Sequence, residues 1–179
     1  MRTLFEIDTK DYDPNGRAFV RPSVRGIILR NGTVAMVHSL KYDYYKFPGG
    51  GIESGESQIQ TLIREVQEES GLIVLPETTR EYGNVSRKQK SDRVGEYELF
   101  VQDNYYYLCD AAEDIGKQAL DDYEKDEHFT LEWVNPEHAI DINRNRDHGP
   151  KDQRMLEREA RVLEMLLQEN YFVQDAGIC

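Results

Sequence analysis

The chain has 179 residues, of which 39% are hydrophobic, and its formal net charge is −12. This length suffices for one domain with a real core and is too short for two domains of ordinary size. The excess of acidic residues disfavours a long basic surface that could bind the phosphates of a nucleic acid. No apolar run approaches the roughly 18 residues that a membrane span needs. We therefore expect a single domain over 1–179, with neither a nucleic-acid nor a membrane partner.

The cysteines and the N-terminus bear on the compartment. Cys109 and Cys179 belong to no C-x-x-C or Cys/His ligand pattern, and the first residues contain no apolar stretch like that of a secretory signal peptide. Free thiols and a soluble, cytoplasmic protein are the expectation.

The first 50 residues predict strands and one aromatic segment. Residues 1–22 include a Pro-Asn-Gly turn and predict a lead-in strand or hairpin, and Asn31-Gly32 between two β-rich runs predicts a hairpin with a type I′ turn. Tyr44 and Tyr45 follow in a short strand or loop. Aromatic faces beside a nucleotide site can stack a base, although packing at a strand edge is the simpler interpretation.

A glycine-rich loop and a helix come next. Gly49, Gly50 and Gly51 allow close approach of the backbone to a ligand, Ser57 can cap a helix, and Gly71 can end it. An apolar stripe at helical spacing predicts packing on a sheet; it consists of Ile59, Leu62, Ile63 and Val66.

Three glutamates share another face of this helix. At about 100° per residue, Glu65, Glu68 and Glu69 project away from the apolar stripe and repel one another. A hard divalent cation would offset that repulsion, because Mg²⁺ and Mn²⁺ prefer carboxylate oxygens. If the three glutamates are considered alone, the alternative interpretation to a metal site is a solvent-exposed helix face in an acidic protein.

The second half predicts a sheet and a final helix. Arg87 and Lys88 lie in the main basic concentration of the chain and either reach substrate phosphates or form a solvated hairpin tip. Residues 96–109 predict a long central strand, or two in succession, and 110–127 an acidic surface loop. The remaining predictions are a strand over 129–134, a short helix through Ile140, a polar loop, and a C-terminal helix over 151–170.

The spacing G50-x5-E56-x7-R64-E65-V66-x-E68-E69-x-G71-L72 resembles the Nudix box at every defined position. The resemblance implies an α/β fold, in which the box forms a loop–helix–loop on an α/β/α sandwich with a mixed β-sheet between helices. It also implies hydrolysis of a nucleoside diphosphate linked to another moiety, with Mg²⁺ or Mn²⁺ as the cofactor.

The same resemblance assigns roles to residues. Glu65, Glu68 and Glu69 would hold the metal with a backbone carbonyl of Gly49 or Gly50, while Glu56 and Arg64 orient the cluster. Family members take the general base from the box or from a loop before the last strand. The loop candidate is Glu127, with Glu124 behind it; Glu68 and Glu69 are the alternatives, and an exposed acidic loop is the simpler interpretation of Glu127.

Other functions on this fold remain open at this point. A non-hydrolytic sensor of a nucleotide or nucleotide sugar is the main alternative, although a binding protein has no need of every carboxylate. Isoprenoid diphosphate isomerisation relies in that family on a cysteine ahead of the box, and both cysteines here follow it. The substrate is left open among oxidised nucleoside triphosphates, ADP-ribose, nucleotide sugars and dinucleoside polyphosphates, and a homodimer is the working expectation.

Overall fold

The computed structural model describes residues 1–93 and 95–173. Its helices are α1 (Gln58–Ser70), α2 (Asp122–Asp126), α3 (Pro136–Asn145) and α4 (Gln153–Gln168), with a 3₁₀ turn η1 (Pro76–Thr78). Its strands are β1 (Thr3–Asp8), β2 (Ala18–Val20), β3 (Ser23–Ile27), β4 (Leu29–Arg30), β5 (Thr33–Ser39), β6 (Tyr44–Lys46), β7 (Leu72–Val74), β8 (Arg80–Lys90), β9 (Leu99–Leu108), β10 (Ala111–Ile115) and β11 (Phe129–Val134).

The strands of the described residues form three sheets. In the largest, which is mixed, β8 is antiparallel to β9, β1 is parallel to β8, and β2 and β3 are parallel to β9. The second sheet pairs β4, β6 and β11 with β5, and the third pairs β7 with β10, all antiparallel. The single strand β9 lies at the centre of the mixed sheet, as predicted.

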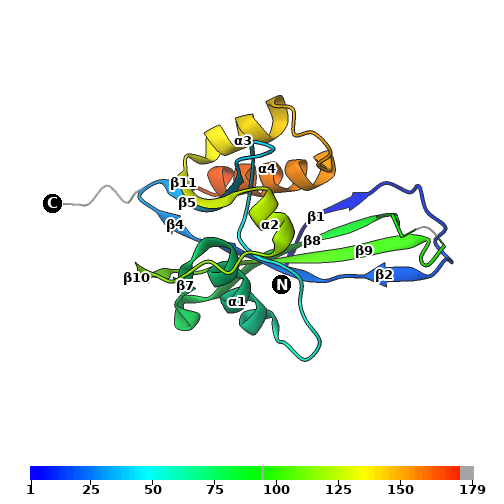
Figure 1. The fold of residues 1–179 in the computed structure, drawn as a ribbon, viewed down its shortest axis with the longest axis horizontal. Coiled ribbons are helices and arrows are strands. Elements are labelled where there is room, and N and C mark those ends of the chain that lie inside the picture. The colour runs from blue at the N-terminus through cyan, green and yellow to red at the C-terminus, as the bar shows by residue number, and fades with distance from the viewer. Residues whose placement is uncertain (94, 174–179) are drawn as a thin grey trace.

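Helices cover both faces of this β-structure. Neighbouring side chains on β9 point to opposite faces: Tyr106 packs in the cluster that contains Leu163 of α4, and Tyr107 in the cluster that contains Leu62 of α1. Figure 1 shows α1 on one side of the strands and α3 and α4 on the other. The predicted α/β/α sandwich is confirmed.

The helix α1 begins and ends where the sequence predicts. The Ser57 hydroxyl accepts a hydrogen bond from Gln60 N at 3.2 Å, Gln60 Oε1 accepts one from Ser57 N at 2.9 Å, and Gly71 has a φ of 77°. Leu62 and Val66 are fully buried beneath the helix. The apolar stripe thus anchors α1 and leaves the three glutamates on a different face of the helix.

The Asn31-Gly32 turn is confirmed, with positive φ values of 50° and 75°. Only β4 continues from it as a hairpin with β5, because the preceding residues 23–27 leave to form β3 beside β9. Likewise, β1 and β2 pair with β8 and β9 rather than with each other, so the first 22 residues form separate lead-in strands and not a hairpin.

Two predicted loops contain regular structure. The acidic segment 110–127 includes β10 and α2, and it buries Glu124 and Glu127, so the prediction of a surface loop is wrong for these residues. The second is the polar loop predicted after Ile140: α3 continues to Asn145, so the first part of that loop is helical. The helix α4 closely matches the predicted C-terminal helix.

Two further sequence expectations concern thiols and membrane spans. Cys109 is a buried free thiol, and burial raises its pKa to about 12, whereas Cys179 lies outside the described residues. Within 1–93 and 95–173, no helix combines the length and the apolarity that crossing a membrane requires.

A buried ion pair ties α4 to the glycine-rich loop. Arg158 donates to Glu159 Oε1 from Nε at 2.8 Å and from Nη2 at 2.6 Å, and Glu159 Oε2 accepts from the backbone N–H of Phe47 at 2.8 Å. Burial alone would raise the pKa of Glu159, but the neighbouring Arg158 and Arg25 outweigh it and hold this pKa below its ordinary value.

Replacing Glu159 by Gln should lower the free energy of unfolding by about 3–5 kcal/mol, because Arg158 would remain buried without an anionic partner. The matched control is Glu164→Gln on the same helix, which breaks a partly exposed pair with Arg144 and should cost about 0–1 kcal/mol. Urea unfolding measures both, and equal losses would contradict the role given to the buried pair.

Candidate active site

The glycine-rich loop is fixed by side chains from β3 and α1. The backbone N–H of Gly49 donates to Glu69 Oε2 at 2.8 Å, and the Gly49 carbonyl accepts a hydrogen bond from Arg25 Nη1. A Cβ at Gly49 would lie well under 3.0 Å from the Val24 carbonyl oxygen, and one at Gly50 would overlap the Glu65 carboxylate. Glycine is therefore required where the loop lies between β3 and α1.

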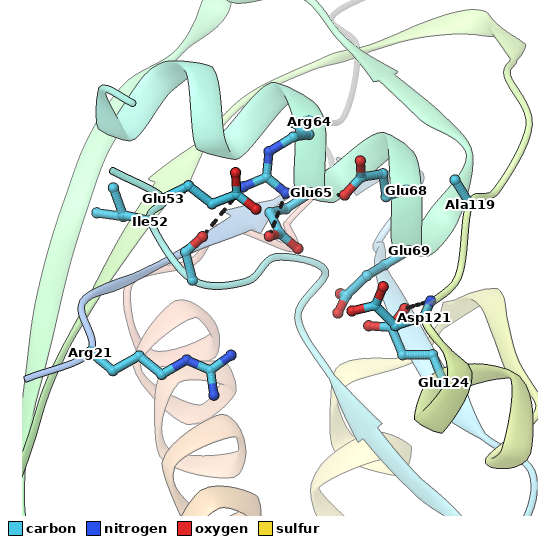
Figure 2. Close-up of a pocket in the computed structure, with 11 residues that line it drawn as sticks. Arg21, Ile52, Glu53, Arg64, Glu65, Glu68, Glu69, Ala119, Asp121 and Glu124 are labelled. Atoms are coloured by element: carbon cyan, nitrogen blue, oxygen red, sulfur yellow. Dashed lines mark hydrogen bonds and ion pairs between the residues drawn. The ribbon is translucent and has the colours of Figure 1, made fainter. Parts of the chain in front are cut away.

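Arg64 joins three carboxylates of the box. Its Nε and Nη2 donate to the two oxygens of Glu56 at 2.7 and 2.8 Å, and its Nη1 donates to Glu65 at 2.7 Å and to Glu68 at 3.0 Å. This fork of hydrogen bonds orients the carboxylates and holds the pKa of Glu56 down to about 2. Figure 2 shows Arg64 between Glu65 and the glycine-rich loop.

Glu65 and Glu68 each keep one oxygen available. Arg64 binds Oε1 of Glu65 and Oε2 of Glu68, and within the described part of the chain no hydrogen bond engages their other oxygens. Burial raises the pKa of Glu65, while Arg64 opposes this shift. A cation in the cleft would meet two fixed carboxylate oxygens and would relieve the cost of burying Glu65.

Glu69 is held differently from the other two. Its side chain is 2% exposed, Lys46 donates to Oε1, and Gly49 donates to Oε2. Burial raises its pKa to about 7, against the opposing charge of Lys46. The three glutamates share one helix face, yet no three acidic, histidine or cysteine side chains among the described residues form a ready metal-binding cluster.

An acidic cleft of about 540 Å³ lies along this face of α1. Asp121 and Glu124, at the start of α2, line its opposite wall, and Figure 2 shows them across from Glu69. Glu124 Oε2 accepts from Asp121 N at 2.7 Å and its Oε1 from the Tyr123 hydroxyl at 2.9 Å. Asp121 and Glu124 have the spacing of a capping box, which is the sequence signal that could have predicted this short helix in place of a loop.

Glu127 does not reach the acidic cleft. It is 3% exposed and accepts hydrogen bonds from Ser39 Oγ at 3.0 Å and the Tyr44 hydroxyl at 2.8 Å, while Lys151 forms an ion pair with it. Of the two carboxylates considered in this segment, Glu124 lines the cleft and Glu127 lies outside it.

The predicted stacking tyrosines are packed in the interior. Tyr44 and Tyr45 are 2% and 4% exposed; Tyr44 packs edge-on against Phe129, and Tyr45 stacks on His38 with ring centroids 4.3 Å apart. Both rings therefore pack mainly against neighbouring side chains, although Tyr44 also lines a cavity beside the glycine-rich loop. Base stacking by either tyrosine stays a prediction.

Arg87 and Lys88 also lie outside the acidic cleft. Arg87 is buried in an ion pair with Asp152, and burial lowers its pKa, whereas Lys88 is exposed on the sheet. Successive residues of β8 point to opposite faces, so these two cannot act on one ligand together.

A second cavity, also of about 540 Å³, adjoins the first. We call it the basic chamber, because its walls carry Arg21, Arg25, Lys46 and Lys151. It shares Arg21 and Gly51 with the acidic cleft. Sequence reasoning missed Arg21 and Arg25, since two arginines in a β-rich run carry no motif.

Comparison with known proteins decides the family. The family model of the NUDIX domain matches residues 20–158. This chain belongs to the NUDIX family. The fold agrees with a structure from a study of MutT from Aliivibrio salmonicida and Vibrio cholerae, at 19% identity and a TM-score of 0.52 over 84% of this chain and 99% of that one. A NUDIX hydrolase from Nitrosomonas europaea gives 15% identity and a TM-score of 0.56 over 86% and 89%.

Curated relatives match over a shorter stretch. An RNA pyrophosphohydrolase of Stenotrophomonas maltophilia is 36% identical over 62 residues, and one of Xylella fastidiosa is 40% identical over 63 residues. Each match covers 34% of this NUDIX chain and 29% and 31%, respectively, of the relatives. The chain thus aligns with less than a third of their length.

Replacing Gly50 by Ala should displace Glu65 without unfolding the protein, because the new Cβ would meet the movable end of that side chain. We expect Mn²⁺ affinity to fall at least about tenfold. Gly51→Ala is the matched control, since a Cβ there meets Arg21 Nε at an ordinary 3.4 Å. Calorimetric titration with Mn²⁺ compares the two, and equal affinities would count against the role of the Gly50–Glu65 contact.

Proposed function

We propose that this NUDIX chain hydrolyses a phosphoanhydride bond in a nucleoside diphosphate linked to another moiety, with Mg²⁺ or Mn²⁺ as cofactor. The observation that carries the proposal is the arrangement around Arg64, which fixes Glu65 and Glu68 with one free oxygen each at the wall of a cleft. A neighbouring chamber with basic side chains offers a place for an anionic substrate.

The residues present fit a divalent ion. Glu65 Oε2 and Glu68 Oε1 are hard oxygen donors, and the carbonyls of Gly49 and Gly50 lie on the same loop, although each already accepts a hydrogen bond. When bound, such an ion would neutralise diphosphate charge and lower the pKa of a coordinated water. Glu69, the third predicted ligand, supports the loop through Gly49 while Lys46 engages its other oxygen.

The chain's own groups would orient the reaction. Arg64 keeps Glu56, Glu65 and Glu68 in register, and Glu124 extends from the opposite wall, where a carboxylate can take a proton from an attacking water. Glu127 lies outside the acidic cleft and holds Lys151 and Tyr44, which line the basic chamber. We therefore propose Glu124 as the general base and Glu127 as a positioning residue.

The substitution Glu124→Gln should lower kcat by about 10²–10⁴-fold with little change in KM, because the amide retains its shape but cannot accept the proton. Glu127→Gln, the matched control from the same segment, should lower kcat less and should reduce the melting temperature, because Lys151 would lose its buried partner. Steady-state kinetics and thermal melts of both variants provide the measurement. A larger kcat loss for Glu127→Gln would reverse the assignment.

The activity itself is tested by phosphate or pyrophosphate release from a substrate panel with Mg²⁺ or Mn²⁺. The panel contains nucleoside triphosphates, ADP-ribose, nucleotide sugars, dinucleoside polyphosphates and, in view of the curated relatives' names, a 5′-triphosphorylated RNA oligonucleotide. We expect turnover of at least one, abolished by EDTA and restored by Mn²⁺. Tight binding of one compound with no turnover of any would favour the sensor alternative.

The organisation of the whole chain belongs to the same proposal. We propose that 1–179 form one domain, that it acts in the cytoplasm and that it assembles as a homodimer.

A further inference from the structure

The cations of the basic chamber differ in how far they are neutralised. Lys46 is paired with Glu69, and Lys151 is paired with Glu127. Two acidic side chains also line the chamber: Asp152 forms ion pairs with Arg87 and Arg154, and Asp92 forms none within the described residues. Arg21 and Arg25 are left, in the described structure, without a carboxylate partner of their own.

Arg25 shows the clearest unmet hydrogen-bonding need. Its side chain is buried at 9% exposure, and Nη1 donates to the Gly49 carbonyl. Its Nε is one of two buried side-chain nitrogen or oxygen atoms without a partner in the part of the chain described here. An unpaired buried charged donor is costly, and Arg25 also lines the chamber, so an anionic ligand there would stabilise its guanidinium group.

Arg21 stands at the junction of the two cavities. It lines both the acidic cleft and the basic chamber, and its Nε lies next to Gly51 of the glycine-rich loop. Figure 2 shows its guanidinium extended toward the cleft, across from Glu65. No side-chain hydrogen bond or ion pair of Arg21 exists within 1–93 and 95–173, so this guanidinium is available to a ligand that spans both cavities.

Building on the proposed function, we propose that Arg21 and Arg25 bind a terminal phosphoryl group of the substrate in the basic chamber while the scissile anhydride lies in the acidic cleft. Two guanidinium groups match the charge and the several oxygens of one phosphate. A neutral sugar would leave both guanidinium groups unpaired, and a site built for a polar partner rejects an analogue that lacks it. The substrate class is therefore a nucleotide that ends in a phosphate.

Inorganic pyrophosphate in EDTA tests the phosphate site without catalysis. Without divalent cations the acidic cleft repels this probe, so calorimetric binding reports the basic chamber. We expect the intact protein to bind pyrophosphate and Arg21→Gln to weaken binding at least about tenfold. Arg25→Gln should do the same, and Arg80→Gln, an exposed arginine outside both cavities, should stay within about twofold. No binding by the intact protein, or unchanged binding in Arg21→Gln, would overturn the proposal.

Kinetics separate this inference from the proposed function. For ATP and for 5′-triphosphorylated RNA, Arg21→Gln should raise KM at least about tenfold, with the larger effect marking which source of the terminal phosphate the chamber accepts. The intact protein should turn over ADP-ribose and UDP-glucose poorly, and the KM measured for either should change by less than about threefold in Arg21→Gln. If Arg21→Gln turned over both triphosphates with an unchanged KM, the phosphate site would be contradicted and the proposed hydrolase activity would be retained. If pyrophosphate binding depended on Arg21 and Arg25 but no substrate were turned over, the phosphate site would be supported and the proposed hydrolase activity would be contradicted.

Because Arg25 also supports Gly49, its variant needs a check on folding. Arg25→Lys retains the charge but loses the fork, so it should recover the melting temperature more fully than it recovers pyrophosphate affinity. Equal recovery of both would show that Arg25 acts only through the loop.

Discussion

The close approach of the glycine-rich loop to β3 and α1 is the constraint on which the site depends. At Gly26 of β3, an added Cβ would lie 2.9 Å from Val66 of α1, and at Gly49 and Gly50 it would overlap the Val24 carbonyl and the Glu65 carboxylate. Bare backbone at these positions lets strand, loop and helix pack without intervening side chains. The carboxylates of α1 therefore lie directly beside the loop and not one side-chain length away.

Charge is segregated over a short distance in a protein whose net charge is −12. Arg64 neutralises part of the acidic cleft, and Lys46 neutralises Glu69 at its inner end. Arg21 belongs to both cavities and marks the boundary between them. Arg21 and Arg25 thus place positive charge beside the acidic cleft of a protein whose net charge would otherwise repel an anion.

The sequence predicts best what depends on local spacing. The capping box at Ser57, the stop at Gly71 and the common face of Glu65 and Glu68 follow from helical geometry, and the structure agrees. It predicts poorly what depends on distant partners. The burial of Glu127 requires Lys151, and the orientation of Arg25 requires Gly49; neither pair is close enough in the chain to leave a pattern.

The hydrogen bond from the Phe47 backbone to Glu159 links the start of the box to the last helix. A transplant of residues 47–72 into another scaffold would carry the motif but not this distant acceptor, and the entrance to its loop would lack an anchor. The C-terminal helix α4 therefore supports the box although it lies outside the box sequence. A truncation that removes α4 would remove this support as well.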